Sequence, residues 1–385
     1  MRLSSDAPLR SRANAAPELA IDTAPLSLPR RCRPEAEEDP SYRCRLSYPS
    51  RVRMARMSAW TRIFRRNLAA ITRKAARLYS PALRAGLSSS LAKSRRPAGE
   101  DAWIGGLAVG SMGAKRFKLY RPPRVESEER LPLMVMLHGC RQDADSFAAS
   151  TRMNRIARRD RFFVLYPEQD RMANGQGCWN WFDTSTGRAY GEASLILKAI
   201  DQVCRLYPVD HERIAVAGLS AGASMAGLLG ARQPTRFKAV VMHSGIAPGT
   251  AHSPYSAVVA MRGQRVTKEL TDVAPADATS WPALLVIHGD ADTVVSPQNG
   301  EAAVEAWANA VGAKPGAARS VQRGGRYPMR VTDYKRHGST AAILVQVSHL
   351  AHAWSGGAAN KPYGDALGPD ASRMAWSFAS RQFRP

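Results

Sequence analysis

Long apolar runs are missing from this sequence. The longest, at 131–137 and 282–287, are far shorter than the roughly 18 residues that a membrane-spanning helix needs, so no transmembrane segment is predicted. Five cysteines in 385 residues are too few for the dense disulfide framework of a small secreted scaffold. Metal-ligand spacings and phosphate-cradling glycine loops are also missing, so we expect no metal and no cofactor.

Acidic residues are scarce beside basic ones. The chain has 55 Lys and Arg against 32 Asp and Glu, a net charge of +23. This excess is uneven, because residues 51–96 carry thirteen basic residues and no acidic one. A nucleic-acid binder would pair such charge with a recognisable module, and zinc-finger spacing, RNP-like aromatic strings and helix-turn-helix signals are missing. We therefore expect no nucleic-acid partner.

The first 53 residues are rich in Arg, Pro, Ser and Glu and show no apolar periodicity. Such a composition cannot offset the entropy lost on folding, so residues 1–53 are predicted to be disordered. Met54 and Met57 then open a different kind of sequence. An alternative interpretation is therefore that translation begins there and that residues 1–53 are an over-extended reading.

Residues 54–97 are interpreted as a basic amphipathic leader and linker. Apolar residues recur at helical spacing between Trp60 and Tyr79, with arginines mostly on the other side, and Pro81 ends the pattern. One interpretation is a surface helix, residues 54–81, that binds an anionic membrane or granule. The alternative is a leader that only packs on the body or stays mobile. It is not a standard secretory signal, because positive charge runs through the apolar stretch.

Residues 98–385 alternate between strand-like and helix-like segments. Strands are predicted at 116–120, 131–137, 162–166, 213–217, 239–243, 283–288 and 343–347, and helices at 146–160, 192–207, 221–232, 301–310 and 369–381. Strand and helix in alternation imply parallel strands joined by right-handed crossovers. The sequence thus predicts one α/β domain, a doubly wound, mostly parallel sheet with helices on both faces.

A Gly-x-Ser-x-Gly pattern, Gly218-Leu219-Ser220-Ala221-Gly222, lies between a predicted strand and a predicted helix. The pattern alone is weak, but its position favours a sharp strand-to-helix turn that exposes the hydroxyl of Ser220 at the end of the sheet. The alternative is a glycine-rich packing turn.

A serine nucleophile needs a base, and the base needs an orienting acid. On this kind of turn the acid and then the histidine follow along the chain. Asp292, just after the strand at 283–288, is the preferred acid, with Asp290 as its rival. His352, beyond the strand at 343–347, is preferred over His349 because it lies deeper in its loop.

The oxyanion of an acyl-transfer intermediate requires two N–H donors. The residue after the nucleophile, Ala221, is expected to supply one of them. The loop after the strand at 131–137 is expected to supply the other through the N–H of Cys140, with Gly139 allowing close approach.

These residues resemble the esterase/poly(3-hydroxybutyrate) depolymerase family of α/β-hydrolase-fold serine esterases, whose relatives include feruloyl and acetylxylan esterases. The resemblance covers about residues 100–382 and lies in Leu137-His138-Gly139-Cys140, Tyr166-Pro167-Glu168-Gln169, Cys178-Trp179-Asn180-Trp181-Phe182, Gly218-Leu219-Ser220-Ala221-Gly222, His243-Ser244-Gly245, His288-Gly289-Asp290-Ala291-Asp292 and His352-Ala353-Trp354.

The resemblance implies a catalytic triad of Ser220, Asp292 and His352, and it supports Asp292 over Asp290. It also implies hydrolysis of carboxylic esters, of poly- or oligo(3-hydroxybutyrate) type or of short-chain or feruloyl-like type. An extracellular or envelope location follows from the family, and association with a cytoplasmic granule is the alternative.

The neighbouring loops supply further expectations. Trp179, Trp181 and Trp354 either line a substrate pocket or pack in the core. Cys140 and Cys178 lie in loops at one end of the predicted sheet, where a disulfide between them would imply an oxidising compartment.

The sequence leaves three functions open for this domain. Ester hydrolysis through an acyl-enzyme on Ser220 is preferred. Peptidase activity is an alternative on the same fold, which an assay of amides against esters separates. A non-catalytic surface-binding protein that retains the fold is the third. The segment 246–280 is the natural lid, and its conformation is not readable from the sequence.

Overall fold

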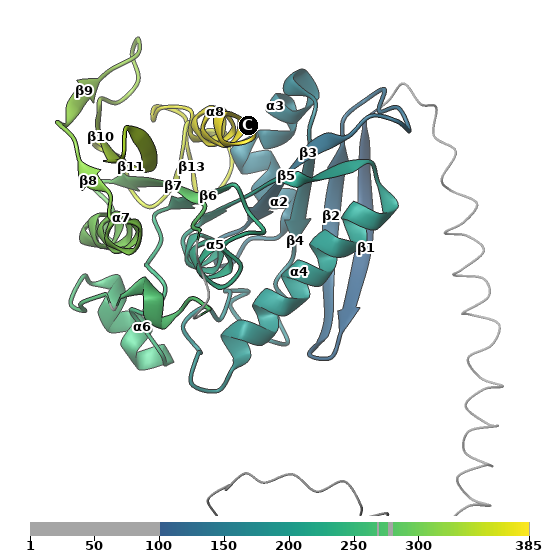
Figure 1. Cartoon of the computed structure of the whole chain (residues 1–385), viewed down its shortest axis with the longest axis horizontal. Coiled ribbons are helices and arrows are strands. Elements are labelled where there is room, and N and C mark those ends of the chain that lie inside the picture. The colour runs from purple at the N-terminus through teal and green to yellow at the C-terminus, as the bar shows by residue number, and fades with distance from the viewer. Residues whose placement is uncertain (1–100, 268, 276–279, 385) are drawn as a thin grey trace, which may run out of the picture. The chain divides into compact units, whose positions relative to one another are not determined.

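The computed structural model of the chain describes residues 101–384 apart from 268 and 276–279 (Figure 1). The predicted segments 1–53 and 54–97 lie outside these residues. In the described part, one sheet has the strand order β1-β2-β4-β3-β5-β6-β7-β11-β10-β8, and β9 pairs with β10. Its strands are β1 (Ala102–Gly110), β2 (Gly113–Arg121), β3 (Leu131–Leu137), β4 (Phe163–Pro167), β5 (Val209–Leu219), β6 (Ala239–His243), β7 (Ala283–Gly289), β8 (Lys314–Pro315), β9 (Arg319–Val321), β10 (Met329–Arg336) and β11 (Ser339–Val347). A separate parallel pair is formed by β12 (Trp354–Ser355) and β13 (Gly364–Asp365).

The centre of the main sheet is parallel. Strands β4, β3, β5, β6, β7 and β11 run in one direction, while β1 and β2 at one edge and β10 at the other are antiparallel to their neighbours. Every residue of β3 is buried, as expected of a parallel strand covered on both faces. Because the central strands are parallel, their carboxyl ends all lie on the same side of the sheet, and so do the loops that follow them; we call this side the carboxyl edge.

Helices cover both faces of the sheet (Figure 1). The helices are α2 (Ala144–Thr151), α3 (Met153–Asp160) and α8 (Ala371–Gln382) on one face, and α4 (Arg188–Leu206), α5 (Ala221–Arg232) and α7 (Gln298–Val311) on the other. Alternate residues of β3 enter two separate cores: Leu133 and Val135 pack on the α4 and α5 side, and Met134 and Met136 on the α2 and α8 side. A short helix α6 (Pro254–Met261) and a 3-10 turn (Leu270–Asp272) lie in the segment 246–280.

The predicted doubly wound, mostly parallel α/β sheet is confirmed. The prediction of a single helix over 146–160 is wrong in one respect, because the structure has two helices there, α2 and α3. Arg152 between them adopts a left-handed φ of 57°, and its N–H closes α2 by donating to the carbonyl of Ala148. Strand β1 was not predicted, since its glycines hide the strand signal. The ring of Phe117 packs over Gly106 of β1, where a Cβ would lie 2.1 Å from the end of that ring.

Candidate active site

Ser220 occupies the turn between β5 and α5. Its backbone angles, φ 57° and ψ −121°, are ones that residues with a side chain rarely adopt. Its N–H donates to the carbonyl of His243 over 2.9 Å. A Cβ on Gly218 would lie 2.3 Å from the backbone of Gly222, and one on Gly222 would lie 2.1 Å from the carbonyl oxygen of Leu137. The two glycines are therefore required for the turn, and the turn presents Ser220 at the carboxyl edge of the sheet.

Asp292 and His352 are in contact. His352 Nδ1 lies 2.8 Å from Asp292 Oδ2, and the aspartate side chain has no exposed surface. The other oxygen, Oδ1, accepts from the N–H groups of Val294 and Val295, both at 2.9 Å. His288 Nε2 is 3.4 Å from Oδ2 on the other side. The carboxylate is thus held by three hydrogen bonds and adjoins His288, whose Nε2 lies closer to the carbonyl of Val295, at 2.9 Å. An Nδ1–H donated by His352 leaves the Nε2 of His352 free to accept a proton.

The electrostatics of this pair favour an ionised aspartate. Burial opposes ionisation of Asp292, but hydrogen bonds from His288 and His352 outweigh it and hold the pKa of this carboxyl well below its usual range. A buried carboxylate beside a ring N–H stabilises the imidazolium that forms when the histidine accepts a proton.

The two rival residues lie elsewhere in the same loops. Asp290 is exposed, and its carboxylate accepts the backbone N–H of His349 over 2.7 Å. The ring of His349 is also exposed and lies against Tyr327, with 5.8 Å between ring centroids. The contact between Asp290 and His349 therefore ties the loop after β7 to the loop after β11. In the described residues no hydrogen bond joins the Ser220 hydroxyl to either histidine.

The loop after β3 lies against the Ser220 turn. A Cβ on Gly139 would be 3.6 Å from the carbonyl of Leu219, the residue before Ser220. In the described part of the chain, neither the N–H of Cys140 nor that of Ala221 donates to a protein acceptor. Both N–H groups are therefore available as donors, and an oxyanion requires two.

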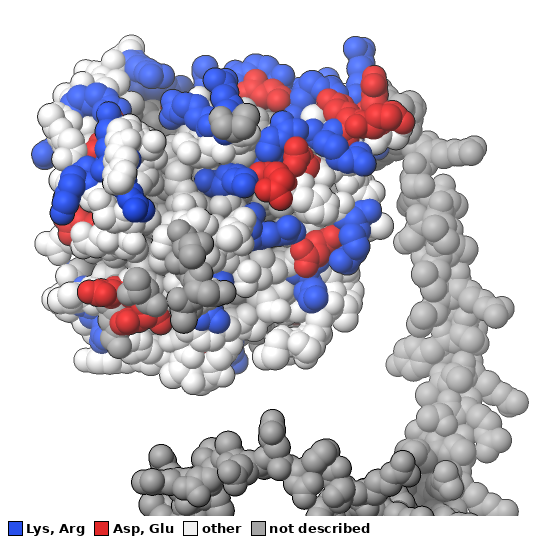
Figure 2. Space-filling model, viewed as in Figure 1, with Lys and Arg blue, Asp and Glu red and all other residues white. Residues whose placement is uncertain are grey.

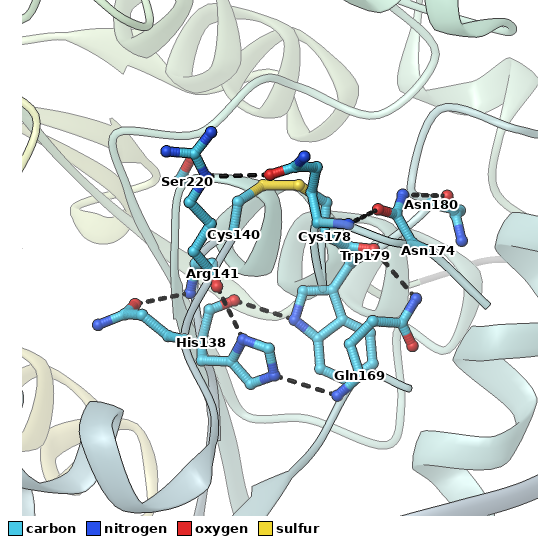
Figure 3. Close-up of a disulfide and its surroundings, with 12 residues drawn as sticks. His138, Cys140, Arg141, Gln169, Asn174, Cys178, Trp179, Asn180 and Ser220 are labelled. Atoms are coloured by element: carbon cyan, nitrogen blue, oxygen red, sulfur yellow. Dashed lines mark hydrogen bonds between the residues drawn. A yellow bond between two sulfur atoms is a disulfide. The ribbon is translucent and has the colours of Figure 1, made fainter. Parts of the chain in front are cut away.

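A disulfide between Cys140 and Cys178, with 4.3 Å between their Cα atoms, anchors this loop (Figure 3). Figure 3 also shows the indole of Trp179, whose Nε1 donates to the carbonyl of His138 over 3.0 Å. His138 Nδ1 lies 2.8 Å from the carbonyl oxygen of Gly139, and His138 Nε2 accepts the N–H of Gln169. Burial lowers the pKa of His138 to about 4, so this ring is a neutral brace at neutral pH.

Beneath this loop is a buried polar network that sequence reasoning missed. Lys115 Nζ donates to Gln169 over 2.6 Å and lies 4.9 Å from the ring centre of Trp179. Gln169 donates in turn to the carboxylate of Glu192, which also accepts from the side chain of Asn180 over 2.6 Å. Burial lowers the pKa of Lys115. Only the family motifs around Gln169 and Asn180 hinted at these positions, because their contacts join segments far apart in the chain.

His243 is a second buried brace. Its Nε2 accepts the N–H of Ser355 over 3.1 Å, and its ring stacks on Trp354. Burial, and then the neighbouring His288 and His352, lower its pKa to about 3. Because the carbonyl of the same residue holds the N–H of Ser220, His243 connects the serine turn to the loop that follows His352.

The tryptophans expected near the site are mostly internal. Trp179 and Trp354 have no exposed surface, and the Nε1 of Trp354 donates to Ser372 over 3.0 Å. For these two residues the structure favours the alternative interpretation, core packing. Trp181 keeps 7% exposure and contacts Phe182 edge to face. Substrate contact thus remains a proposal for Trp181.

No group of three or more His, Cys, Asp and Glu residues in the part of the chain that the structure describes is arranged to hold a metal ion. No helix of the same part has the length and apolarity to cross a membrane.

A parallel sheet with a serine turn after β5, an acid after β7 and a histidine after β11 defines the α/β-hydrolase class of proteins. The chain belongs to the family described as Esterase PHB depolymerase, which matches residues 115–321, more than half of its length. That range contains Ser220 and Asp292 and ends before His352. The relatives named below are carboxylic ester hydrolases.

Among curated proteins, poly(3-hydroxyalkanoate) depolymerase C of Paucimonas lemoignei is 32% identical over 197 residues, 46% of this chain and 44% of that protein. Feruloyl esterase B of Thermothelomyces thermophilus is 28% identical over 207 residues, 50% of this chain and 69% of that protein. The chain therefore spans less than half of the depolymerase. Among solved structures, an acetyl xylan esterase from Aspergillus awamori superposes with a TM-score of 0.53 at 18% identity, over 66% of this chain and 94% of the other, which supports the fold.

Proposed function

We propose that this protein is a serine esterase that hydrolyses carboxylic esters through an acyl-enzyme on Ser220. The observation that carries the proposal is the hydrogen bond between the fully buried Asp292 carboxylate and His352, on the sheet edge where the strained turn places Ser220. A buried carboxylate that orients a histidine at that edge is the arrangement that activates a serine hydroxyl.

The steps follow from the roles of these groups. Ser220 Oγ attacks the ester carbonyl carbon while Nε2 of His352 takes the hydroxyl proton. The N–H groups of Cys140 and Ala221 stabilise the oxyanion. The carbon–oxygen bond to the alcohol then breaks, and the alcohol leaves with the proton from His352. Water, deprotonated by the same histidine, hydrolyses the acyl-enzyme and restores Ser220.

For the substrate, we propose an aliphatic hydroxy-acid polyester or its oligomers, with short-chain and feruloyl-type aromatic esters as the other members of the class. The support is the family together with the names of the relatives, which include a polyhydroxyalkanoate depolymerase and feruloyl and acetylxylan esterases. For location, we propose an oxidising compartment, extracellular or in the envelope. The disulfide between Cys140 and Cys178 supports it, because disulfides persist in such compartments.

A substrate panel tests the function. It contains p-nitrophenyl butyrate, 3-hydroxybutyrate oligomers, amorphous polyester granules, methyl ferulate and a matched anilide. Ser220→Ala is expected to abolish hydrolysis and labelling by a fluorophosphonate probe, whereas Ser127→Ala, at an exposed loop serine, leaves both unchanged. No hydrolysis of any ester and no labelling of folded wild-type protein would refute the proposal and favour a non-catalytic binding protein. Faster cleavage of the anilide would favour a peptidase.

Residues 54–81 carry a separate proposal, adsorption to an anionic membrane or granule. They lie outside the described residues, so its support is the sequence pattern alone. Co-sedimentation of the full chain with phosphatidylglycerol vesicles and with polyester granules tests it, compared with a variant in which Arg65, Arg66 and Arg73 are glutamine. Equal sedimentation of both proteins would contradict it.

A further inference from the structure

A cleft of about 400 Å³ lies between α8 and the strands β7, β9, β10 and β11. Its volume falls in the range of small-molecule sites. Its floor is apolar and is formed by Leu285, Val331, Ile343, Val345, Met374 and Phe378.

The rim of the cleft is strongly basic. Five arginines line it, against one carboxylate, Asp370: they are Arg319, Arg323, Arg326, Arg373 and Arg381. Figure 2 shows Lys and Arg side chains gathered over the region of β9, β10 and α8, with little acidic surface among them.

The pairing of these arginines differs. Arg319 binds Asp333, and Arg326 donates to the carbonyls of Ala366 and Gly368. By contrast, Arg323, Arg373 and Arg381 have no carboxylate within 4.0 Å in the described part of the chain. Arg373 still interacts at longer range with the carboxylate of Asp160. In the described part of the chain, Arg323 and Arg381 are therefore the rim cations without a protein counter-ion. Cations at the edge of an apolar floor are complementary to an anion that carries an apolar chain.

The periodicity of α8 builds this arrangement into the sequence. Arg373, Met374, Ser377, Phe378 and Arg381 recur at spacings of one, three and four residues, so they share one face of the helix. Arginine head groups therefore lie beside the apolar side chains of the same face. This is the pattern of a site for an amphiphile, with a charged end and an aliphatic tail.

The cleft is distinct from the proposed active site but close to one of its loops. Ser220, Asp292 and His352 do not line it. Tyr327 lines it and contacts the ring of His349, which lies three residues before His352. A ligand in the cleft is thus separate from the serine and adjoins the histidine loop.

We propose that this cleft binds an aliphatic carboxylate, with the carboxylate held by the rim arginines and the chain on the apolar floor. Planar guanidinium groups match carboxylates in bidentate geometry. The rim arginines and the apolar floor favour an anion with an apolar chain whether or not the protein hydrolyses esters. The choice of a carboxylate among anions rests on the proposed function, because ester hydrolysis releases a carboxylic acid.

Isothermal titration of the full chain with dodecanoate, kept below its critical micelle concentration, tests the proposal. Wild type and Ser220→Ala are expected to bind one dodecanoate with equal affinity. Arg323→Gln/Arg373→Gln is expected to weaken binding about tenfold, since both arginines are exposed and two solvent-screened ion pairs together account for about that factor. The matched control is Arg330→Gln, an exposed arginine between Met329 and Val331 of β10 that does not line the cleft, and it is expected to change the affinity less than twofold.

Several results would overturn the proposal. Dodecyltrimethylammonium, which has the same tail and the opposite charge, would bind equally well if only apolar contact mattered. Loss of dodecanoate binding after Ser220 is blocked with a phosphonate would assign the binding to the active site. Binding to phosphatidylglycerol vesicles without binding of dodecanoate would indicate a membrane surface. If the wild-type protein hydrolyses no ester but still binds dodecanoate, the cleft proposal stands and only the catalytic proposal is refuted. Equal binding by Ser220→Ala shows that the cleft does not depend on the serine.

Discussion

Replacing Asp292 by asparagine is the sharpest test of the proposed site. The substitution keeps the size of the side chain, and an amide oxygen in the Oδ1 position still accepts the N–H groups of Val294 and Val295. The amide NH2 then faces His352 and donates to its Nδ1. This reverses the ring tautomer, so the proton moves to Nε2 and the ring no longer accepts a proton from Ser220.

The magnitude follows from the distance between the two groups. Asp292 Oδ2 and His352 Nδ1 are 2.8 Å apart, and the carboxylate is fully buried. With an effective dielectric constant of about 20, a carboxylate stabilises an imidazolium at this range by about 4–6 kcal/mol. Removing that attraction predicts a loss of about 1,000- to 10,000-fold in kcat.

The assay is the initial rate on p-nitrophenyl butyrate, with active sites counted by the phosphonate probe and folding checked by near-ultraviolet circular dichroism. Asp290→Asn is the matched control, because Asp290 is exposed and, among the described residues, its side chain accepts only the N–H of His349. It is expected to change kcat less than about fivefold, in keeping with a surface contact. If Asp292→Asn keeps more than a tenth of the wild-type kcat, or if Asp290→Asn causes the larger loss, the assignment of the acid is wrong.

Three further predictions concern the scaffold. Gly222→Ala is expected to lower thermal stability strongly and to abolish phosphonate labelling, because its Cβ would lie 2.1 Å from a β3 carbonyl; Gly175→Ala, which has open space around its Cβ, is the control, and equal melting temperatures would contradict the reasoning. The Cys140→Ser/Cys178→Ser variant is expected to lose about 4 kcal/mol of unfolding free energy in urea, from a loop closed over a sequence separation of 38, and an unchanged midpoint would count against it. The ring of His138 is expected to stay neutral down to about pH 4, whereas a histidine in the unfolded chain titrates near pH 6.5. The stability that the neutral ring contributes is therefore full above about pH 6.5 and is lost as pH falls toward 4. A 15N titration of the folded protein with a midpoint near 6.5 for His138 would refute this.

Local patterns were enough to predict the order of the central elements, but they did not predict β1, α6, β8, β9 or β10. The uniformly apolar run at 131–137 is β3 with the predicted bounds, and the strand at 239–243 is β6. Two of the failures are positions whose conformation has no apolar signal. Arg152 adopts a left-handed conformation in the middle of a helical pattern, and β1 is a glycine-rich edge strand whose alternation is weak.

The choice between rival site residues illustrates the limit of sequence reasoning. Asp290 and Asp292 follow the same strand two residues apart, so chain position alone left both open. Only the folded loops show that Asp292 contacts His352 and that Asp290 holds the backbone of His349. Such contacts depend on two loops more than fifty residues apart in the chain, which no local pattern encodes.

The sequence by itself determined the doubly wound α/β architecture, the serine turn and the proposed nucleophile, because these depend on short-range periodicity and on glycines at fixed spacing. It narrowed the acid to Asp290 or Asp292 and the base to His349 or His352. Tertiary structure alone decided which tryptophans are buried, which aspartate contacts the histidine, and that Lys115, Gln169 and Glu192 form a network under the oxyanion loop. The arginine-rimmed cleft belongs to this second group, since its floor and rim come from strands and a helix that meet only when the sheet is complete. The physical reason is that burial and pairing are properties of long-range contacts.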